Sequence, residues 1–296
     1  MIPALKGIRH FATTTTLTQA VSEFRMTVPW GEVRGQAWGP DQGRPVLCLH
    51  GWADNSGSFN RLIPLLPNAL QWKRFSIIGH SMGGNVAGMF SALYPEMVES
   101  VVLLDSYGFL PTNMSRMVQL IKKGMDQHVM YDNEADDKKE KVYTYEKAKE
   151  RLMSANRFLS DKSADILLER AVREVEGGLV FTRDFRIIMR NIVMITLEQS
   201  LFMLSLIQAR VMLLMADQGL DNVFPVPDGF ADDLRKGWMD QKGTIVCVEG
   251  DHHVHLNKPD SVAPIITDFL QSHRPDSTEM TLTAISLPNF NTLLSY

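Results

Sequence analysis

The amino-acid sequence predicts an α/β protein in which helices cover both faces of a mostly parallel sheet. Three short apolar runs lack polar alternation, as strands buried on both faces do: residues 45–49, 75–78 and 101–104. Two further runs have strand character, residues 210–215 and 244–248, and helix-compatible runs occupy residues 85–94 and 261–270. A chain of 296 residues with 45% hydrophobic content is long enough for one large domain, or for a domain with an insertion.

The overall composition favours a soluble protein with a small-molecule partner. The net charge of −4, from 30 basic and 34 acidic residues, gives no electrostatic footprint for nucleic acid. No apolar run reaches the ~18 residues of a membrane span, so no transmembrane segment is expected. Cys48 and Cys247 lie in apolar strand-like runs, where reduced thiols behave as small hydrophobes. This usage indicates an intracellular, reducing compartment, either cytoplasmic or organellar.

The two ends of the chain differ in composition from the middle. Residues 1–22 carry Lys6, Arg9 and four consecutive threonines, with no acid before Glu23, a bias that resembles a mitochondrial presequence. The alternative is an ordinary flexible N-terminus. Residues 273–296 are rich in Thr, Ser, Leu and Asn, and we expect this C-terminal tail to add little to the fold.

Folded structure is expected to begin near residue 24. Residues 24–30 and 33–38 are typical of two short strands joined around Gly31, which is a hairpin signal. After the first apolar run, a helix is expected from about residue 58 to residue 66.

The pentapeptide Gly79-His80-Ser81-Met82-Gly83 has the pattern Gly-x-Ser-x-Gly between a strand and a helix, which is typical of a nucleophile elbow. The glycines on either side allow a strained backbone and close packing of the strand and the helix. Ser81 is therefore expected to lift its hydroxyl above the sheet as a nucleophile. The alternative is a serine that only caps the helix.

The residues after the first apolar run suit an oxyanion hole. Gly51 lets the backbone turn, so that the amide of Trp52 can face the hydroxyl of Ser81. The amide of Met82, in the first helical turn, is the second expected donor. His50 is expected to be a turn histidine bonded to a loop carbonyl, rather than a catalytic residue.

Residues 109–209 differ from the rest of the chain because their periodicity is mostly helical. The charge run at residues 132–141 is best explained as a solvated face. This region is rich in methionine, at positions 114, 117, 125, 130, 153, 189, 194 and 203. These side chains are either core filler or the flexible apolar lining of a cap over a lipophilic substrate. We therefore expect a helical cap at residues 109–209, inserted into a core formed by residues 23–108 and 210–272.

Three segments together resemble the α/β-hydrolase superfamily: residues 45–59, 75–104 and 248–270. The sequences of three shorter stretches are similar to those of the vertebrate serine hydrolase-like proteins: residues 47–52, 61–67 and 95–98. The resemblance covers most of the chain between residues 24 and 270. It implies the α/β-hydrolase fold with a helical cap, and a serine hydrolase that needs no cofactor and no metal.

In this family the nucleophile, the acid and the histidine follow one another along the chain. In related hydrolases the catalytic histidine stands seven residues before a proline, and Pro259 selects His252. An imidazole that titrates near neutrality suits the proton transfer from Ser81. His255 is the alternative, although we expect it to pack locally, and we expect His253 to point elsewhere.

The expected acid lies in the loop after residue 215. Asp221 stands four residues before Pro225, as the usual family pattern requires, so it is the first choice. Asp217 is a nearer alternative, and Asp105, at the end of the preceding strand, is where some relatives place the acid. A buried carboxylate at this point orients the imidazole and stabilises its charged form. Asp217 and Asp221 could instead be ordinary turn residues.

One departure from the family concerns the fourth strand. In relatives about forty residues, which supply a strand and a helix, separate the helix ending near Pro67 from Phe75, and here only residues 68–74 remain. The N-terminal hairpin thereby loses its partner in the sheet. It either moves over to residues 46–49, or two edges stay unpaired, with buried amides that cost ~1–3 kcal/mol each. We therefore expect a compromised or rearranged sheet that keeps the motif loops.

The leading functional hypothesis is hydrolysis of an ester or related acyl bond of a small, apolar substrate through an acyl-Ser81 intermediate. Epoxide and haloalkane hydrolysis are disfavoured because those relatives place an aspartate where this chain has Ser81. The competing hypothesis is a catalytically silent member that binds a small ligand or a partner.

Overall fold

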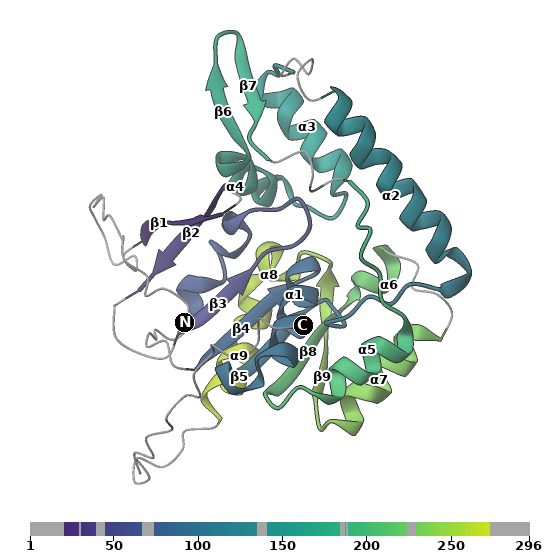
Figure 1. Cartoon of the computed structure of the whole chain (residues 1–296). Helices are drawn as coiled ribbons and strands as arrows, with labels where there is room; N and C mark the ends of the chain where they lie inside the picture. The colour runs from purple at the N-terminus through teal and green to yellow at the C-terminus, as the bar shows by residue number, and fades with distance from the viewer. Residues whose placement is uncertain are drawn as a thin grey trace.

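A five-stranded parallel sheet forms the centre of the molecule (Figure 1). The structure is a computed structural model that describes residues 21–272, apart from residues 30, 40–44, 67–73, 135–140, 184–186, 188 and 224–228. The strand order is β3-β4-β5-β8-β9, and every neighbouring pair is parallel. The strands are β3 (Val46–Leu49), β4 (Phe75–His80), β5 (Val98–Leu104), β8 (Arg210–Gln218) and β9 (Thr244–Asp251).

Alternate residues of the central strands enter two separate hydrophobic clusters. Ile77 of β4 and Leu103 of β5 belong to the cluster on one face, whereas Ile78 and Leu104 belong to the cluster on the other. All residues of β4 are buried, so the expectation of strands covered on both faces is confirmed there. The four residues of β3 are only half-buried, because β3 is an edge strand of this sheet.

Each face of the sheet has its own layer of helical segments. The first cluster packs under α1 (Met82–Leu93), α5 (Leu197–Ser205) and α7 (Phe230–Asp240). The second lies under α9 (Pro259–Gln271) and the two short segments η1 (Ser56–Phe59) and η2 (Ile63–Leu65), with α8 (Val254–Asn257) beside them. The prediction of a single helix at residues 58–66 is wrong, because η1 and η2 occupy this stretch. Pro64 has no N–H, and tight i to i+3 bonds replace an α-helical turn there.

The N-terminal hairpin is confirmed, but it stands apart from the main sheet. β1 (Val21–Val28) and β2 (Gly31–Trp38) form an antiparallel two-stranded sheet of their own. Among the described residues, neither β2 nor β3 pairs with a strand on its outer edge. This is the second of the two expected outcomes, a sheet with unpaired edges. The hairpin begins at Val21, a little earlier than expected, and residues 1–20 and 273–296, where the two chain ends were expected to be flexible, lie outside the described residues.

The connections on either side of β4 cross opposite faces of the sheet. Both β3 to β4 and β4 to β5 step in the same direction through the strand order. The described part of the first connection, η1 and η2, packs on the α9 face, whereas α1 packs on the other face. The described part of the first connection thus lies on the face opposite to α1, whereas two right-handed crossovers that step in the same direction lie on one face.

Between β5 and β8 most of the chain forms a separate layer at the upper side of Figure 1. It contains α2 (Met114–Glu134), α3 (Tyr145–Ala155), α4 (Asp161–Ala171) and an antiparallel hairpin, β6 (Val172–Val175) with β7 (Gly178–Phe181). Side-chain hydroxyls of Thr144 and Ser160 cap α3 and α4. The last helix of this stretch, α5, packs instead on α1 and α7. The charge run at residues 132–141 falls largely outside the described side chains.

None of the helices in the described ranges combines the length and the apolar character needed to cross a bilayer. Cys48 in β3 and Cys247 in β9 are both free thiols. Burial raises the pKa of Cys48 to about 12, so this thiol stays protonated at neutral pH. Cys247 is exposed.

Candidate active site

Ser81 occupies a strained turn between β4 and α1. Its backbone has φ 52° and ψ −114°, a conformation that non-glycine residues rarely adopt. A Cβ at Gly79 would lie 2.4 Å from the carbonyl oxygen of Gly83, and a Cβ at Gly83 would lie 2.1 Å from that of Leu49. The turn therefore requires both glycines of the motif. Ser81 makes no side-chain capping bond to α1, so the helix-cap alternative is wrong.

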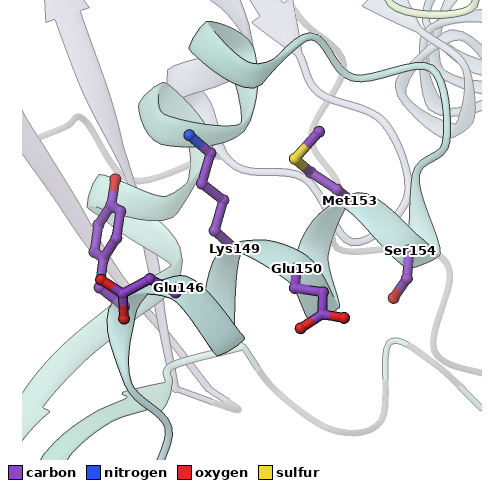
Figure 2. A pocket seen from close by; sticks show the side chains of 6 residues that line it. Glu146, Lys149, Glu150, Met153 and Ser154 are labelled. Atoms are coloured by element: carbon purple, nitrogen blue, oxygen red, sulfur yellow. The ribbon is translucent and has the colours of Figure 1, made fainter.

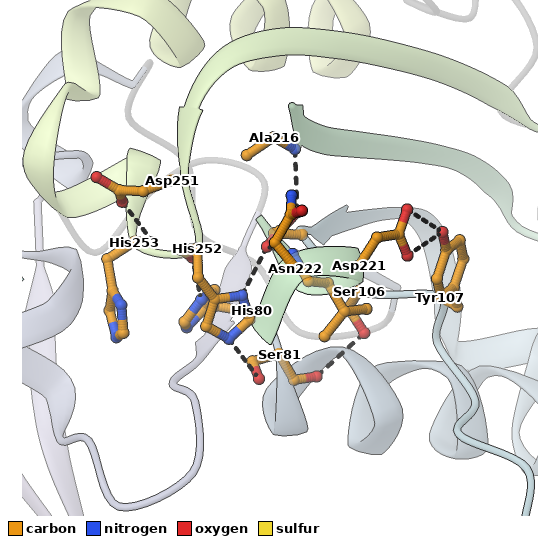
Figure 3. Close-up of polar contacts among 12 residues, drawn as sticks. His80, Ser81, Ser106, Tyr107, Ala216, Asp221, Asn222, Asp251, His252 and His253 are labelled. Atoms are coloured by element: carbon orange, nitrogen blue, oxygen red, sulfur yellow. Dashed lines mark hydrogen bonds and ion pairs between the residues drawn. The ribbon is translucent and has the colours of Figure 1, made fainter. Parts of the chain in front are cut away.

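The hydroxyl of Ser81 points at His252, as Figure 3 shows. The distance from His252 Nε2 to Ser81 Oγ is 3.0 Å, and the distance from His252 Nδ1 to Asp105 Oδ2 is 2.6 Å. The carboxylate can only accept a hydrogen bond, so Nδ1 carries the proton and Nε2 presents a lone pair to the serine. His252 follows β9 directly, and the parallel strands bring it to the same edge of the sheet as Ser81.

Asp105 lies at the carboxyl end of β5, and its side chain is 0% exposed. Its two oxygens also accept backbone N–H groups, from Ala216 at 3.0 Å and from Leu220 at 2.6 Å. These amides compensate for the loss of water around a buried charge, and they stabilise the ionised carboxylate.

The prediction that Asp221 faces the histidine is wrong, because Asp105 holds that place. Asp221, in α6 (Leu220–Val223), is 44% exposed and accepts a hydrogen bond from Tyr107 Oη at 2.8 Å and another from Arg235. The loop after β8 wraps around the Asp105 carboxylate so closely that a Cβ at Gly219 would lie 2.3 Å from it. Backbone amides at the end of β8 and the start of α6 therefore bind Asp105, and among the described hydrogen bonds Asp221 has none to His252.

The nearby carboxylate and tyrosine have structural partners of their own. Asp217, the second alternative, accepts the backbone N–H of Gly250 at 2.9 Å. Burial and the hydrogen bond to Asp221 both raise the pKa of Tyr107, so this phenol stays protonated and acts as a donor. Neither aspartate contacts His252 through any described hydrogen bond.

His50, His253 and His255 lie where the sequence suggested. His50 Nδ1 is 2.9 Å from the carbonyl oxygen of Gly51, as expected of a turn histidine. His255 is fully buried, and its ring centroid lies 5.3 Å from that of Phe59, so it packs locally. His253 turns away from Ser81, and its Nε2 lies 3.3 Å from Asp54 Oδ2. Burial lowers the pKa of His80 to about 4, so this ring is neutral at neutral pH.

The segment expected to form the oxyanion hole lies beside the first turn of α1. Gly83 packs against the carbonyl groups of Leu49 and His50, which brings the end of β3 next to the start of the helix at Met82. The indole of Trp52 is half exposed and donates to the carbonyl oxygen of Ile187 at 2.6 Å. This bond ties the segment to the layer between β5 and β8.

A pocket of about 660 Å³ lies along one side of α3 (Figure 2). All of its lining side chains come from this helix: Tyr145, Glu146, Lys149, Glu150, Met153 and Ser154. None of them belongs to the predicted site, and we assign the pocket no part in it.

Comparison with known proteins identifies the family. A protein of Danio rerio named serine hydrolase-like protein is 60% identical over 317 residues, covering 94% of this chain and 97% of the relative. The chain belongs to the serine hydrolase-like protein family. Serine hydrolase-like protein 2 of Homo sapiens is 35% identical, covering 85% of this chain and 94% of the human protein. Residues 67–138 match the family model described as alpha/beta hydrolase fold.

Solved structures support the same fold for this serine hydrolase-like chain. A hypothetical protein from Pseudomonas aeruginosa PAO1 superposes with a TM-score of 0.71 at 25% identity, covering 84% of this chain and 99% of that structure. The thioesterase domain from the curacin biosynthetic pathway gives a TM-score of 0.66 at 19% identity, covering 83% and 99%. The chain therefore has the α/β-hydrolase fold, and its family names support a hydrolase.

Sequence reasoning missed two groups near Ser81 in this serine hydrolase-like protein. Ser106 donates its hydroxyl to the carbonyl oxygen of Ser81 at 3.1 Å and accepts the N–H of Gly108 at 3.2 Å. Asp54, which lies close to His80 and His253, was not singled out either. Both residues lie in loops that follow the carboxyl ends of sheet strands, β5 for Ser106 and β3 for Asp54, which is the signal that could have identified them.

Proposed function

We propose that this protein hydrolyses an ester or related acyl bond of a small, apolar substrate through an acyl-Ser81 intermediate. The observation that carries the proposal is the continuous contact from Ser81 Oγ through His252 to Asp105. The three side chains have the roles of nucleophile, base and orienting acid, which define this chemistry on several unrelated folds.

In the first half of the reaction Ser81 attacks the carbonyl carbon of the substrate. His252 Nε2 takes the proton from Oγ as the new C–O bond forms. Asp105 stabilises the imidazolium that results, and the two amides bound to its carboxylate hold it in place. The tetrahedral intermediate then collapses, the bond to the alcohol breaks, and His252 returns the proton to the leaving oxygen.

In the second half a water molecule replaces the alcohol. His252 Nε2 removes a proton from the water, whose oxygen attacks the acyl carbon, and the proton passes to Ser81 Oγ as the acid leaves. All of these steps are proton transfers and acyl transfers that the three side chains can complete without a cofactor or a metal.

The amides of Trp52 and Met82 are the proposed donors to the oxyanion. Two observations support this assignment: α1 starts at Met82, so its first N–H groups have no partner within the helix, and Gly83 packs against the end of β3 just before Trp52. Preorganised donors of this kind stabilise the negative charge that develops in the transition state.

Within the expected cap at residues 109–209, we assign α2, α3, α4 and the β6-β7 hairpin as a cap over this site, and α5 as part of the core formed by residues 23–108 and 210–272. The bond from Trp52 to Ile187 supports a cap that reaches the oxyanion segment. Apolar side chains exposed on α2 favour an apolar acyl group: Met114, Val118, Met125, Val129 and Met130. Solved neighbours include proteins named as an esterase and a thioesterase, which both cleave acyl bonds.

A fluorophosphonate probe tests the proposal because it labels only an activated serine. We expect labelling of the folded wild type, no labelling of Ser81→Ala, and strongly slowed labelling of His252→Gln. A folded wild type that is not labelled supports instead a catalytically silent protein that binds a ligand or a partner. The separation of the N-terminal hairpin from the main sheet is the observation that favours this second candidate.

A further inference from the structure

Behind His252 lies a buried cluster of one carboxylate and several imidazoles. Asp54 and His80 have side chains only 1% exposed, and the side chain of His253 is 5% exposed. One ligand atom from each of these three residues lies within 4.8 Å of the other two. Figure 3 shows that His80 and His253 approach from different segments, the end of β4 and the loop after β9.

The polar atoms of this cluster lack the partners that buried groups normally have. Among the described residues, no hydrogen bond reaches either oxygen of Asp54, Nδ1 of His80 or Nδ1 of His253. His253 Nε2 lies 3.3 Å from Asp54 Oδ2, without the alignment of a hydrogen bond. Buried polar groups nearly always form hydrogen bonds, so a buried carboxylate that has only two imidazoles within ion-pair distance indicates a missing partner.

The tautomer of His80 shows what kind of partner is missing. Its Nε2 lies 2.7 Å from the carbonyl oxygen of His252, which can only accept, so Nε2 carries the proton. In the neutral ring Nδ1 is then a bare lone pair, and it faces the carboxylate oxygen Asp54 Oδ2 at 3.7 Å. Two hydrogen-bond acceptors that face one another in a buried site repel each other, and a cation bound between them would remove this repulsion. A histidine that donates its other N–H to a backbone carbonyl is also the usual arrangement around a ligated metal.

We propose that Asp54, His80 Nδ1 and His253 Nε2 bind one divalent transition-metal ion of the zinc type. Two imidazoles and one carboxylate form a common donor set for zinc, and ligands of a tetrahedral zinc ion lie about 3.4 Å apart. The measured separations from Asp54 Oδ2, 3.3 Å to His253 and 3.7 Å to His80, are close to that value.

The position of the ion defines its role. Asp54 follows β3 in the segment after Trp52, His80 precedes Ser81, and His253 follows His252. One ion would therefore join the three loops that carry the proposed oxyanion donor, nucleophile and base. It contacts none of the reacting atoms, so the site is a positioning device, and the hydrolysis itself still requires no metal. Its existence does not depend on the proposed function.

Metal binding to the purified full-length chain tests this inference. After treatment with a chelator, we expect one equivalent of Zn²⁺ to be retained through desalting, and one equivalent of Co²⁺ to give the visible absorption of a tetrahedral site. Asp54→Asn and His253→Gln should each weaken binding by at least ~10-fold. His128→Gln, which changes a histidine on α2, and His252→Gln should bind as the wild type does.

Three results would overturn the inference. The first is a wild type that retains no stoichiometric metal, which leaves buried water as the missing partner. The second is binding that survives in His253→Gln but is lost in His252→Gln, which places the ion on the proposed catalytic side chains. The third comes from melting temperatures, which remain informative if a variant folds poorly. Zn²⁺ should raise the melting temperature of the wild type and of His128→Gln, but not that of His253→Gln. An equal rise in all three proteins contradicts the site.

Discussion

The central sheet and the N-terminal hairpin obey the same rules of strand pairing but have different surroundings. Strands β4, β5 and β8 have a partner on each side and apolar clusters above and below. The hairpin β1-β2 has only itself to pair with, and most of its side chains are exposed or half-buried. Ser81, Asp105 and His252 all stand at ends of the central strands. The contacts of the site therefore depend on the paired strands of the central sheet, and not on the hairpin.

The largest expected effect concerns the acid at the centre of the sheet. Asp105→Asn should lower kcat by about 10⁴-fold, because the amide no longer selects the tautomer of His252 that accepts a proton from Ser81. Asp221→Asn is the matched control, since Asp221 contacts Tyr107 and Arg235. Hydrolysis of p-nitrophenyl esters measures both variants. A greater loss in the Asp221 variant would return that residue to the role the sequence first suggested.

Core packing gives the next largest difference between the two regions. Ile78→Ala in β4 removes a fully buried side chain, and we expect the free energy of unfolding to fall by about 2–5 kcal/mol. Val33→Ala in β2 removes a side chain that is 44% exposed, and it should change this free energy by less than about 0.5 kcal/mol. Urea denaturation of both variants measures the contrast. Equal losses would show that the hairpin shares the core.

Hydrogen exchange should separate the two sheets without any substitution. Amides of β5 are bonded on both sides within the buried sheet, so they should exchange only when the whole domain opens. Amides of β2 are paired only with β1, and they should exchange at least about tenfold faster through local opening. Equal protection of β2 and β5 would mean that the hairpin unfolds together with the main sheet.

The smallest expected effect concerns the ion pair that ties the hairpin to α4. The hydrogen bond from Arg170 holds the pKa of Glu23 below its usual range. The stabilisation is therefore present above the ordinary pKa of a glutamate and is lost as the pH falls through the lowered value. Because the pair is exposed, Glu23→Gln should reduce the free energy of unfolding by less than about 1 kcal/mol at pH 7. Thermal melts of the two proteins should converge as the pH is lowered through that value.

The sequence predicted what depends on local pattern and missed what depends on contact through space. Ser81 and His252 were identified because the strained turn and the loop after the last strand each have a recognisable local sequence. The sequence favoured Asp221 over Asp105 because Asp221 stands at the expected number of residues before Pro225. That criterion uses only distance along the chain. In the structure the carboxylate that contacts His252 is Asp105, the one that also accepts the backbone amides of Ala216 and Leu220.

Two features of the fold show the same limit. The periodicity of residues 58–66 favours a helix, but Pro64 and packing against α9 leave only two tight turns. The unpaired edge of the hairpin was predicted correctly, because the usual strand order of the family is enough to show which strand loses its neighbour.

Among the described residues no strand pairs with the outer side of β3, and this has a consequence for how the protein behaves in concentrated solution. The four residues of β3, Val46–Leu49, are all apolar and lack the lysine or proline with which proteins usually protect an exposed edge. Such an edge can be extended by a strand of another molecule, and self-association would then compete with folding during expression. We therefore expect the unusual strand order to affect the solubility and self-association of the protein before it affects the chemistry at Ser81.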